Sequence, residues 1–260
     1  MRIPIYQVDA FADRLFQGNP AAICPLERWL PDPTLQAIAA ENNLAETAFY
    51  VPNGKGYNLR WFTPGVEVDL CGHATLGSAH VVLQIRREIA DASVSFHTRS
   101  GELIVKRDGD LYSMDFPSKP PVECPVDPAL GEALGVKLDV VLGARDYLCI
   151  FETEEEVRAI SPNMEKLGAI DRFGTIVTAP GRDCDFVSRF FAPAKGVPED
   201  PVTGSAHCTL IPYWSKRLGK TKLHARQLSK RGGQLWCEDR GERVTISGKA
   251  VKFLEGEIEV

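Results

Sequence analysis

The pattern of hydrophobic and polar residues predicts that the first half of the chain consists mostly of strands. Residues 3–11 alternate between the two classes, which is the period of a half-buried strand. Shorter apolar runs at 21–26 and 46–51 predict two more strands. Between these runs we expect a helix with Asp32 as its N-cap, because Pro33 suits the first helical position.

Three further strands are expected at 93–98, 102–107 and 111–116, and Asp108-Gly109 is a strong hairpin signal. After them, residues 117–125 hold four prolines and have the composition of a linker. The expected division is an N-terminal lobe at 1–117, a linker at 118–125, a C-terminal lobe at 126–247, and a C-terminal strand at 248–260 that returns to the N-terminal lobe.

The second half of the chain repeats features of the first half. The run Arg60-Trp61-Phe62-Thr63-Pro64 is echoed by Arg189-Phe190-Phe191-Ala192-Pro193, which begins 129 positions later. Each run is followed by a glycine that opens an apolar helix, and these two glycines, Gly72 and Gly204, are 132 positions apart. Two matched pairs in the same order, spaced by about half the chain, predict a duplicated lobe.

Composition and charge exclude several classes of protein. The chain has 260 residues, of which 44% are hydrophobic and 25% are charged, as is ordinary for a globular protein. The formal net charge of −5 does not indicate a nucleic-acid-binding protein. No apolar run approaches the ~18 residues of a membrane span, and the N-terminus lacks the apolar core of a signal peptide.

The cysteines and the known short motifs narrow the chemistry further. The seven cysteines are scattered and form no CxxC pair, which favours reduced thiols in a cytoplasmic protein. Cys71 with His73, and His207 with Cys208, lack the spacing of a four-ligand zinc site, so no metal is expected. The chain contains no GxGxxG, no GxxxxGK[ST] and no GxSxG, so we expect neither a nucleotide cofactor nor a hydrolase.

The two glycine turns can each bind an anion. A strand that ends at a glycine and opens a helix leaves backbone N–H groups free at the positive end of the helix. One such turn alone is more often a plain junction between strand and helix. Two turns related by the repeat could face each other across one cleft between the lobes, which predicts a small anionic carboxylate substrate there.

Polar residues near these turns supply candidate chemistry. His73 follows the first glycine, Ser205 follows the second, and Asp200 lies just before the second turn. Glu46 begins an apolar strand, and it could act as a general acid–base catalyst if burial raised its pKa from ~4.3. Each residue also has a plainer explanation, as a surface charge, a turn residue or a helix cap. Cys71 is either a small buried hydrophobe or a thiol with a lowered pKa.

Two other features have mainly structural explanations. His80 and His207 lie inside predicted helices, and we expect both to be packed or hydrogen-bonded. Residues 201–237 contain seven basic residues and no acidic one. Such a stretch is usually a solvated face, and it would also attract an anionic substrate.

Segments spread along the whole chain match one known family. They are residues 8–11, 18–20, 41–49, 70–75, 200–207, 231–233 and 247–251. The segments ENNLAETAF and DPVTGSAH are specific, because matches of that length are not expected at random. In these segments the sequence resembles the PhzF (phenazine-biosynthesis) family of isomerases, which share the fold of diaminopimelate epimerase.

The resemblance implies an α+β fold of two pseudo-symmetric lobes, each a mixed β-barrel-like sheet around a central helix. It places the active site in the cleft between the lobes and implies a homodimer that uses no cofactor. The phenazine enzyme isomerises trans-2,3-dihydro-3-hydroxyanthranilate by shifting a proton along a cyclohexadiene ring, and a similar reaction is implied for this chain.

The resemblance also assigns roles to individual residues. It implies that Glu46 moves the proton and that the other polar catalytic positions are His73, Asp200 and Ser205. The substrate-binding candidates are Gly72 and Gly204, whose backbone N–H groups would hold a carboxylate, together with Asn19 and Cys71.

One departure from the epimerases bears on the mechanism. Diaminopimelate epimerase uses two opposed cysteines, one at each helix opening. Here Cys71 stands at the first opening, but Thr203 and Ser205 stand at the second, and Cys208 is out of register. The leading hypothesis is therefore a proton-shifting isomerase without a cofactor. The alternatives are an amino-acid racemase or epimerase that uses Cys71 with a non-thiol partner, and a small-molecule-binding protein that has lost catalysis.

Overall fold

The chain folds into two compact units. The computed structural model describes residues 1–260. Unit 1 comprises Met1–Asp115 and Ser247–Val260, and unit 2 comprises Phe116–Ile246. The chain passes from one unit to the other within strands β8 (Leu111–Pro117) and β16 (Arg243–Gly248).

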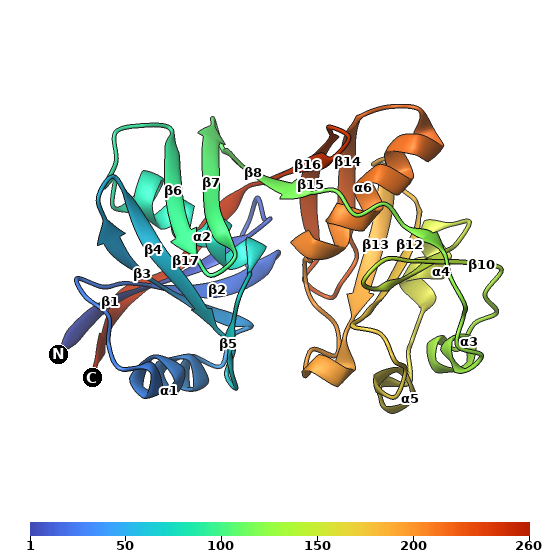
Figure 1. The fold of residues 1–260 in the computed structure, drawn as a ribbon, viewed down its shortest axis with the longest axis horizontal. Coiled ribbons are helices and arrows are strands. Elements are labelled where there is room, and N and C mark those ends of the chain that lie inside the picture. Colours follow the sequence, from blue (N-terminus) through green and yellow to red (C-terminus); the bar gives the residue numbers. More distant parts are fainter. The chain divides into compact units, whose positions relative to one another are not determined.

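Unit 1 is a mixed sheet with one helix packed against most of its strands. Its strands pair in the order β17-β1-β2-β3-β4-β6-β7-β8, with β5 added to β4, and the red strand β17 runs beside the blue strand β1 (Figure 1). Helix α2 contacts strands β1, β2, β3, β7 and β17, and every residue between its two ends is buried. The elements are β1 (Arg2–Ala10), β2 (Asn19–Pro25), α1 (Asp32–Asn42), β3 (Glu46–Asn53), β4 (Gly56–Phe62), β5 (Glu67–Val68), α2 (Gly72–His80), the π-helical turn η1 (Val81–Ile85), β6 (Ser93–Thr98), β7 (Gly101–Asp108), β8 and β17 (Ala250–Glu259).

Unit 2 has a sheet of the same kind. Its strands pair in the order β9-β10-β11-β12-β13-β14-β15, and helix α6 packs on β14 and β15. The elements are β9 (Val122–Glu123), α3 (Ala129–Leu134), β10 (Val140–Gly143), β11 (Tyr147–Ile150), α4 (Glu154–Ala159), α5 (Met164–Gly168), β12 (Thr175–Pro180), β13 (Phe186–Phe191), the 3-10 turn η2 (Pro193–Lys195), α6 (Gly204–Leu218), β14 (Lys222–Gln227), β15 (Gly233–Asp239) and β16.

The two units share one topology. In unit 1, β1 and β2 are antiparallel, β3 joins β2 in parallel after helix α1, and β6 joins β4 in parallel after helix α2. In unit 2, β10 and β11 are antiparallel, β12 joins β11 in parallel after α4 and α5, and β14 joins β13 in parallel after α6. Parallel neighbours require such crossover connections. The predicted α+β class with two similar lobes is confirmed.

The echoed arginine holds the loop before the main helix in both units. Arg60 donates two hydrogen bonds to Glu67 at 2.7 and 2.8 Å, and Arg189 donates two to Glu199 at 2.7 and 3.1 Å. Such bidentate pairs fix geometry as well as charge. The two glutamates are 132 positions apart, like the two glycines. The three extra residues of unit 2 therefore lie between Arg189 and Glu199, where the turn η2 is found.

The proline-rich segment at 118–125 is integrated in unit 2. Its strand β9 pairs with β10, and the backbone N–H of Lys119 donates to the Cys208 carbonyl at 2.9 Å. Pro212, inside α6, has no N–H to donate to that carbonyl four residues before it. The segment expected as a linker thus satisfies a carbonyl that the proline leaves free.

The start of helix α1 also differs from the prediction. Pro31 occupies the N-cap position, so Asp32 is the first helical residue and makes no cap hydrogen bond. Its carboxylate instead pairs with Arg60 at 2.9 Å. An ion pair between residues 28 positions apart is not visible in a local pattern.

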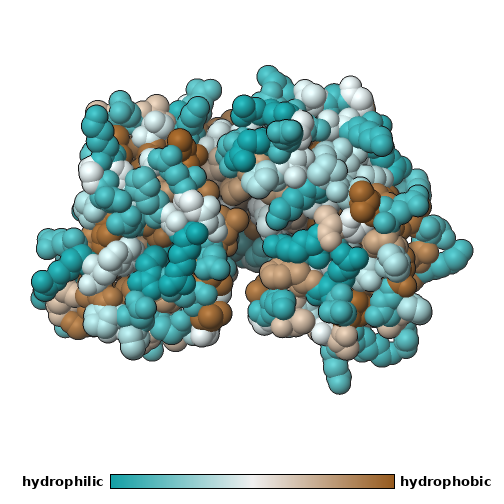
Figure 2. All heavy atoms as spheres, in the orientation of Figure 1, coloured by the Kyte–Doolittle hydropathy of each residue, from teal (hydrophilic) through white to brown (hydrophobic).

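Each unit has its own apolar core, and the face shown in Figure 2 intersperses hydrophilic and hydrophobic residues. Buried side chains of α1 and β3 form part of the core of unit 1, and those of α4 and β12 form part of the core of unit 2. All seven cysteines are free thiols. None of the helices combines the length and the apolar character that crossing a membrane requires.

Candidate active site

The start of helix α2, residues 71–73, forms what we term the first opening. Cys71 is the N-cap residue in an extended conformation, and its side chain makes no cap hydrogen bond. The Cys71 carbonyl accepts two hydrogen bonds from Thr75, one from its backbone N–H at 3.2 Å and one from its hydroxyl at 2.6 Å. The first N–H groups of the helix, from Gly72 onward, therefore keep the capacity to bind an anion.

Three chemically active side chains meet at the first opening. Glu46 begins strand β3, and its Oε2 lies 3.0 Å from Nε2 of His73, close enough for an ion pair. This Oε2 atom is nevertheless buried without a well-aligned hydrogen-bond donor. Sγ of Cys71 lies 3.5 Å from Nδ1 of His73. A buried carboxylate oxygen without an aligned donor is uncommon, and a ligand, a water molecule or a catalytic role can account for it.

The protonation states of Glu46, Cys71 and His73 depend on their burial and on the charges that they exert on one another. Burial alone favours a neutral imidazole, but the charge of Glu46 and the hydrogen bonds to Glu46 and Cys71 raise the pKa of His73 well above its ordinary range. Burial alone would raise the pKa of Glu46, but the charge of His73 holds it below its ordinary value. Burial therefore does not raise the net pKa of Glu46, because the charge of His73 outweighs it. Burial and the Glu46 charge raise the pKa of the Cys71 thiol to about 11.

The first opening thus contains a carboxylate, an imidazolium and a neutral thiol at pH 7. Glu46, Cys71 and His73 each offer one atom to a metal ion, and these atoms lie within 4.8 Å of one another. Metal ligation requires a deprotonated imidazole. A metal ion bound here would therefore have to displace the proton of His73.

Asn19 lies close to this group in the sheet. It begins β2 and is fully buried, two residues before Ala21, the register partner of Glu46. Residues two apart share a face of a strand, and paired residues of parallel neighbours point the same way. The side chains of Asn19 and Glu46 therefore lie on one face of the sheet.

The start of helix α6, residues 203–205, forms the second opening. Thr203 is its N-cap, also extended and without a cap hydrogen bond from its side chain. Its hydroxyl donates instead to the Asp200 carboxylate at 2.6 Å. No atom lies within 4 Å of the place where a Cβ of Gly204 would stand, so the glycine leaves the helix start uncovered.

Gln227 clamps the second opening from β14. Its Oε1 accepts the backbone N–H of Thr203 at 2.9 Å. Its Nε2 donates to the Asp200 carbonyl at 2.8 Å and to the Thr203 hydroxyl at 3.0 Å. Because Gln227 is almost fully buried, these three bonds rigidly fix the approach to the helix.

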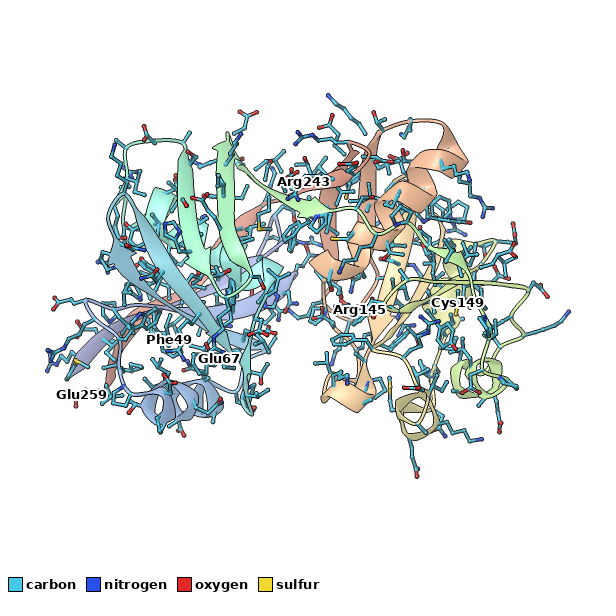
Figure 3. All side chains as sticks on the ribbon, in the orientation of Figure 1. Phe49, Glu67, Arg145, Cys149, Arg243 and Glu259 are labelled. Atoms are coloured by element: carbon cyan, nitrogen blue, oxygen red, sulfur yellow. The ribbon has the colours of Figure 1, made fainter.

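Arg145 supplies the cation of the second opening, from the loop before β11 (Figure 3). Its Nη2 donates to Ser205 Oγ at 3.1 Å and to the Asp146 carboxylate at 2.9 Å. The guanidinium also lies 3.9 Å from the centre of the Phe173 ring. Asp146 is buried and the Arg145 side chain is 34% exposed, so the cation is held in place and remains accessible.

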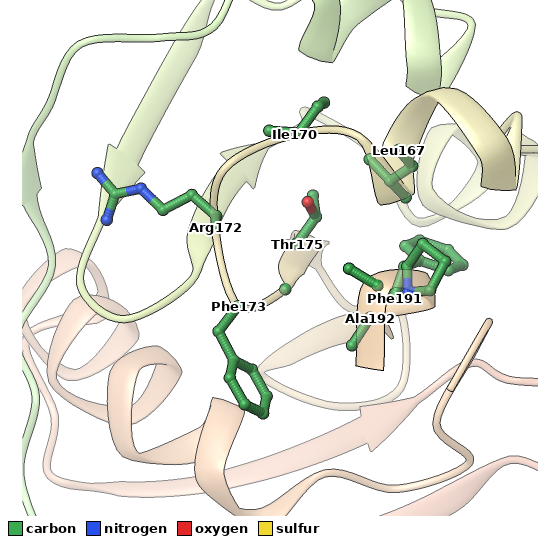
Figure 4. A pocket seen from close by; sticks show the side chains of 10 residues that line it. Leu167, Ile170, Arg172, Phe173, Thr175, Phe191 and Ala192 are labelled. Atoms are coloured by element: carbon green, nitrogen blue, oxygen red, sulfur yellow. The ribbon is translucent and has the colours of Figure 1, made fainter. Parts of the chain in front are cut away.

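A crevice beside this group is too small for a ligand. Residues of the loop before β12, including Phe173, line it together with Phe191 and Ala192 (Figure 4). Its volume is about 10 Å³. A single water molecule needs about that much space.

The predicted site residues thus form two groups. Glu46, Cys71, Gly72 and His73 come together in unit 1, and Asp200, Gly204 and Ser205 come together in unit 2. His207 is structural: its Nδ1 donates to the Thr203 carbonyl at 2.8 Å, and burial lowers its pKa to about 4. Gln227, Arg145 and Asp146 were not predicted from the sequence. Arg145 and Asp146 form a charged pair directly before the apolar strand at 147–150, and this pair was a signal for them.

Known proteins resemble this chain along its whole length. The family model described as phenazine biosynthesis-like protein matches residues 8–256. An uncharacterized isomerase of Pseudomonas aeruginosa is 54% identical over 98% of both chains. The crystal structure of a PhzF family protein from Enterococcus faecalis gives a TM-score of 0.97 at 48% identity, over all of both chains.

More distant structures share the fold alone. A hydroxyproline epimerase of Agrobacterium vitis gives a TM-score of 0.65 at 10% identity, over 99% of this chain and 92% of that one. This likeness confirms the predicted epimerase-like fold. The bacterial relatives that are 46–54% identical are named isomerases. The chain is therefore a member of the phenazine biosynthesis-like (PhzC-PhzF) family and an isomerase.

Proposed function

We propose that the protein is a proton-shifting isomerase that works without a cofactor on a small substrate bearing a carboxylate. The substrate class would be similar to trans-2,3-dihydro-3-hydroxyanthranilate. The observation that carries the proposal is Oε2 of Glu46, a buried carboxylate oxygen that lies 3.0 Å from the imidazolium of His73 without a well-aligned hydrogen bond to it. Such an oxygen is ready to accept a proton from carbon.

The proton shift proposed for unit 1 needs no reagent besides the substrate and the protein's own residues. The substrate carboxylate binds the free N–H groups at the start of α2, where the helix dipole favours an anion. Glu46 accepts a proton from one carbon, so that the substrate becomes a delocalised anion and Glu46 a neutral acid. His73 remains protonated and stabilises the anion by its charge. Glu46 then returns the proton to a different carbon, which shifts the double bond.

For unit 2 we propose a role in holding the substrate's polar groups. Ser205 and Arg145 form a hydrogen-bonded donor pair, and Gly204 leaves the backbone of the helix start accessible. Asp200 is the second carboxylate of the resemblance and is tied to Thr203. The basic stretch at 201–237 adds positive potential to this unit.

Solvent deuterium exchange tests the proposal. A library of small carboxylates, including trans-2,3-dihydro-3-hydroxyanthranilate, is incubated with the protein in D2O and analysed by mass spectrometry. The proposal predicts deuterium incorporation with the wild-type protein and none with Glu46→Gln, although Glu46→Gln still binds the same ligand within about tenfold. Ligand binding without any exchange in the wild-type protein would indicate the binding-protein alternative.

A racemase or epimerase that uses Cys71 is the second candidate, because the Cys71 thiol lies 3.5 Å from His73. Its raised pKa makes it a proton donor rather than a base. The position that would hold a second thiol is Thr203. Inactivation by iodoacetamide, and loss of turnover in Cys71→Ala, would favour this candidate. Full activity of Cys71→Ala would eliminate it.

We also propose that the protein is a cytoplasmic homodimer. Seven free thiols suit a reducing compartment. The dimer rests on the family resemblance. Light scattering of the purified protein should give twice the chain mass of 28.6 kDa at all concentrations tested. A mass of one chain would contradict the dimer.

A further inference from the structure

Unit 1 contains a second polar cavity, at the opposite end of α2 from the first opening. Its volume is about 140 Å³, which leaves room for several water molecules. The polar residues that line it are His80, Gln84, Arg107, Asp110, Tyr112 and Lys249. They come from the end of α2, the turn η1, the β7–β8 hairpin and the residue before β17, all within unit 1.

The charge of this cavity is unbalanced. The Nε of Arg107 donates to the Gly109 carbonyl at 2.9 Å, and no carboxylate lies within ion-pair distance of its guanidinium. Lys249 faces Asp110 at 3.7 Å, and this carboxylate is 80% exposed. Lys252 lies near His80 but is paired with Glu255. Arg107 is therefore the cation of this cavity that has no anionic partner.

The neutral groups in the cavity can also donate hydrogen bonds. Nδ1 of His80 and the hydroxyl of Tyr112 are 2.9 Å apart. Burial, with Arg107 and Lys252, lowers the pKa of His80 to about 4, and burial raises the pKa of Tyr112 to about 12, so neither is charged at pH 7. The side chain of Gln84 has no protein partner.

The backbone at this cavity is unusual. Helix α2 does not end at His80 but continues into the π-helical turn η1, closed by the Arg86 N–H to the Val81 carbonyl at 2.8 Å. π-Helical turns are rare, and they are found frequently at functional sites. The turn contains Gln84, so it brings an amide to the cavity beside His80, Arg107 and Lys249.

We propose that this cavity is a binding site for a small oxyanion, a phosphate or a carboxylate group, separate from the first opening. The guanidinium of Arg107 supplies the main contact, because it binds either group in a bidentate manner. Lys249 adds charge, and Gln84 with the His80–Tyr112 pair adds neutral donors. The size of the cavity limits the ligand to a small anion or to the anionic end of a larger molecule.

The experiment titrates the full-length protein with sodium phosphate and, separately, with sodium malonate, each replacing sodium chloride at constant ionic strength. The thermal unfolding midpoint is followed against anion concentration, since a ligand of the folded state raises it in a saturable way. Arg107→Gln should weaken the apparent affinity by about tenfold and Lys249→Gln by a few-fold. Lys106→Gln, an exposed lysine on the same strand, should have no effect.

Hydrogen exchange measured by mass spectrometry separates this cavity from the helix openings. Saturating anion should protect amides at 80–86 and 104–112, and Arg107→Gln should abolish that protection. An anion bound only at the helix openings would protect residues 72–75 or 204–207 and would bind Arg107→Gln as well as wild type, which overturns the proposal. Saturation by phosphate alone identifies a tetrahedral anion, and saturation by both anions identifies a general oxyanion site.

Discussion

The first and second openings have closely similar backbones and different side chains. Cys71 and Thr203 are both extended N-caps, and each is followed by a glycine. In both units the carbonyl of the N-cap residue accepts a hydrogen bond from the side chain four residues later. The donor is the Thr75 hydroxyl in unit 1 and the His207 ring in unit 2. Two anion-binding helix starts are thus a property of the fold, and the chemistry at each depends on the residues around it.

The acid of the first opening has no counterpart in the second. Thr47 pairs with Phe62, and Thr175 pairs with Phe191, the matching residue of the echoed run, so Glu46 corresponds to Gly174. A Cβ on Gly174 would lie 2.5 Å from the Phe190 ring, so a side chain there would require Phe190 to move. From this difference we infer that proton transfer takes place in unit 1. In the same proposal, unit 2 supplies fixed hydrogen-bond donors.

Among changes that leave Glu46 in place, removing the cation of the first opening should have the largest effect. We expect His73→Asn to lower turnover about 10²–10³-fold. The His73 charge holds the pKa of Glu46 below its ordinary value, so its loss leaves burial to raise that pKa. The acidic limb of the pH–rate profile should therefore move towards neutral pH. An unmoved limb would contradict the ion pair, and His97→Asn, an exposed residue of unit 1, is the control.

Removing the clamp of the second opening should lower stability. Gln227→Leu deletes three buried hydrogen bonds, and we expect a loss of about 2–3 kcal/mol in the free energy of unfolding by urea. The β13–β14 register matches Gln227 to Thr98 of unit 1, which bonds only within its own hairpin. Thr98→Val should therefore cost under about 1 kcal/mol. Equal losses of unfolding free energy in Gln227→Leu and Thr98→Val would contradict the view that only unit 2 has this clamp.

Changing the cation of the second opening should affect binding more than turnover. Lysine cannot reproduce the fork that holds Asp146 and Ser205 together. We expect Arg145→Lys to raise KM about tenfold and to change kcat by less than about threefold. The surface arginine Arg182→Lys serves as the control, because it is 69% exposed. A fall in kcat with unchanged KM would move Arg145 into the proton-transfer machinery.

Exchanging the N-cap of the second opening for that of the first should have the smallest effect. Thr203→Cys loses the hydroxyl that donates to Asp200 and accepts from Gln227, but cysteine suits the same extended backbone. We expect a loss of about 1 kcal/mol in urea unfolding. One additional thiol should react in the unfolded protein. A loss above about 3 kcal/mol would show that the two helix starts are not equivalent.

Local features of the fold could be predicted from the sequence. The strands at 93–98 and 111–116 and the glycine-opened helices follow from alternation, turn residues and helix starts, which act over a few positions. The repeat could be recognised in the sequence because both units keep the arginine that holds the loop before the main helix. Asp32 was wrongly assigned as an N-cap, and the contacts of the segment at 118–125 were not predicted, because their partners, Arg60 and Cys208, are distant in the sequence.

The candidate site could be predicted only in part. The family resemblance singled out Glu46 and His73, and the structure brings them within 3.0 Å. The direction of the Glu46 pKa shift depends on that neighbour, so it could not be predicted from the residue type and its burial alone. Gln227 acts through three bonds to residues more than 20 positions away, and no motif marks it.

The most direct test of the central claim is deuterium incorporation into a bound carboxylate in D2O, measured for wild type, Glu46→Gln and the exposed control Glu41→Gln. If Glu46 carries the proton, wild type and Glu41→Gln incorporate deuterium at equal rates, and Glu46→Gln incorporates none while it still binds the ligand. Undiminished incorporation by Glu46→Gln would contradict the assignment of proton transfer to the first opening.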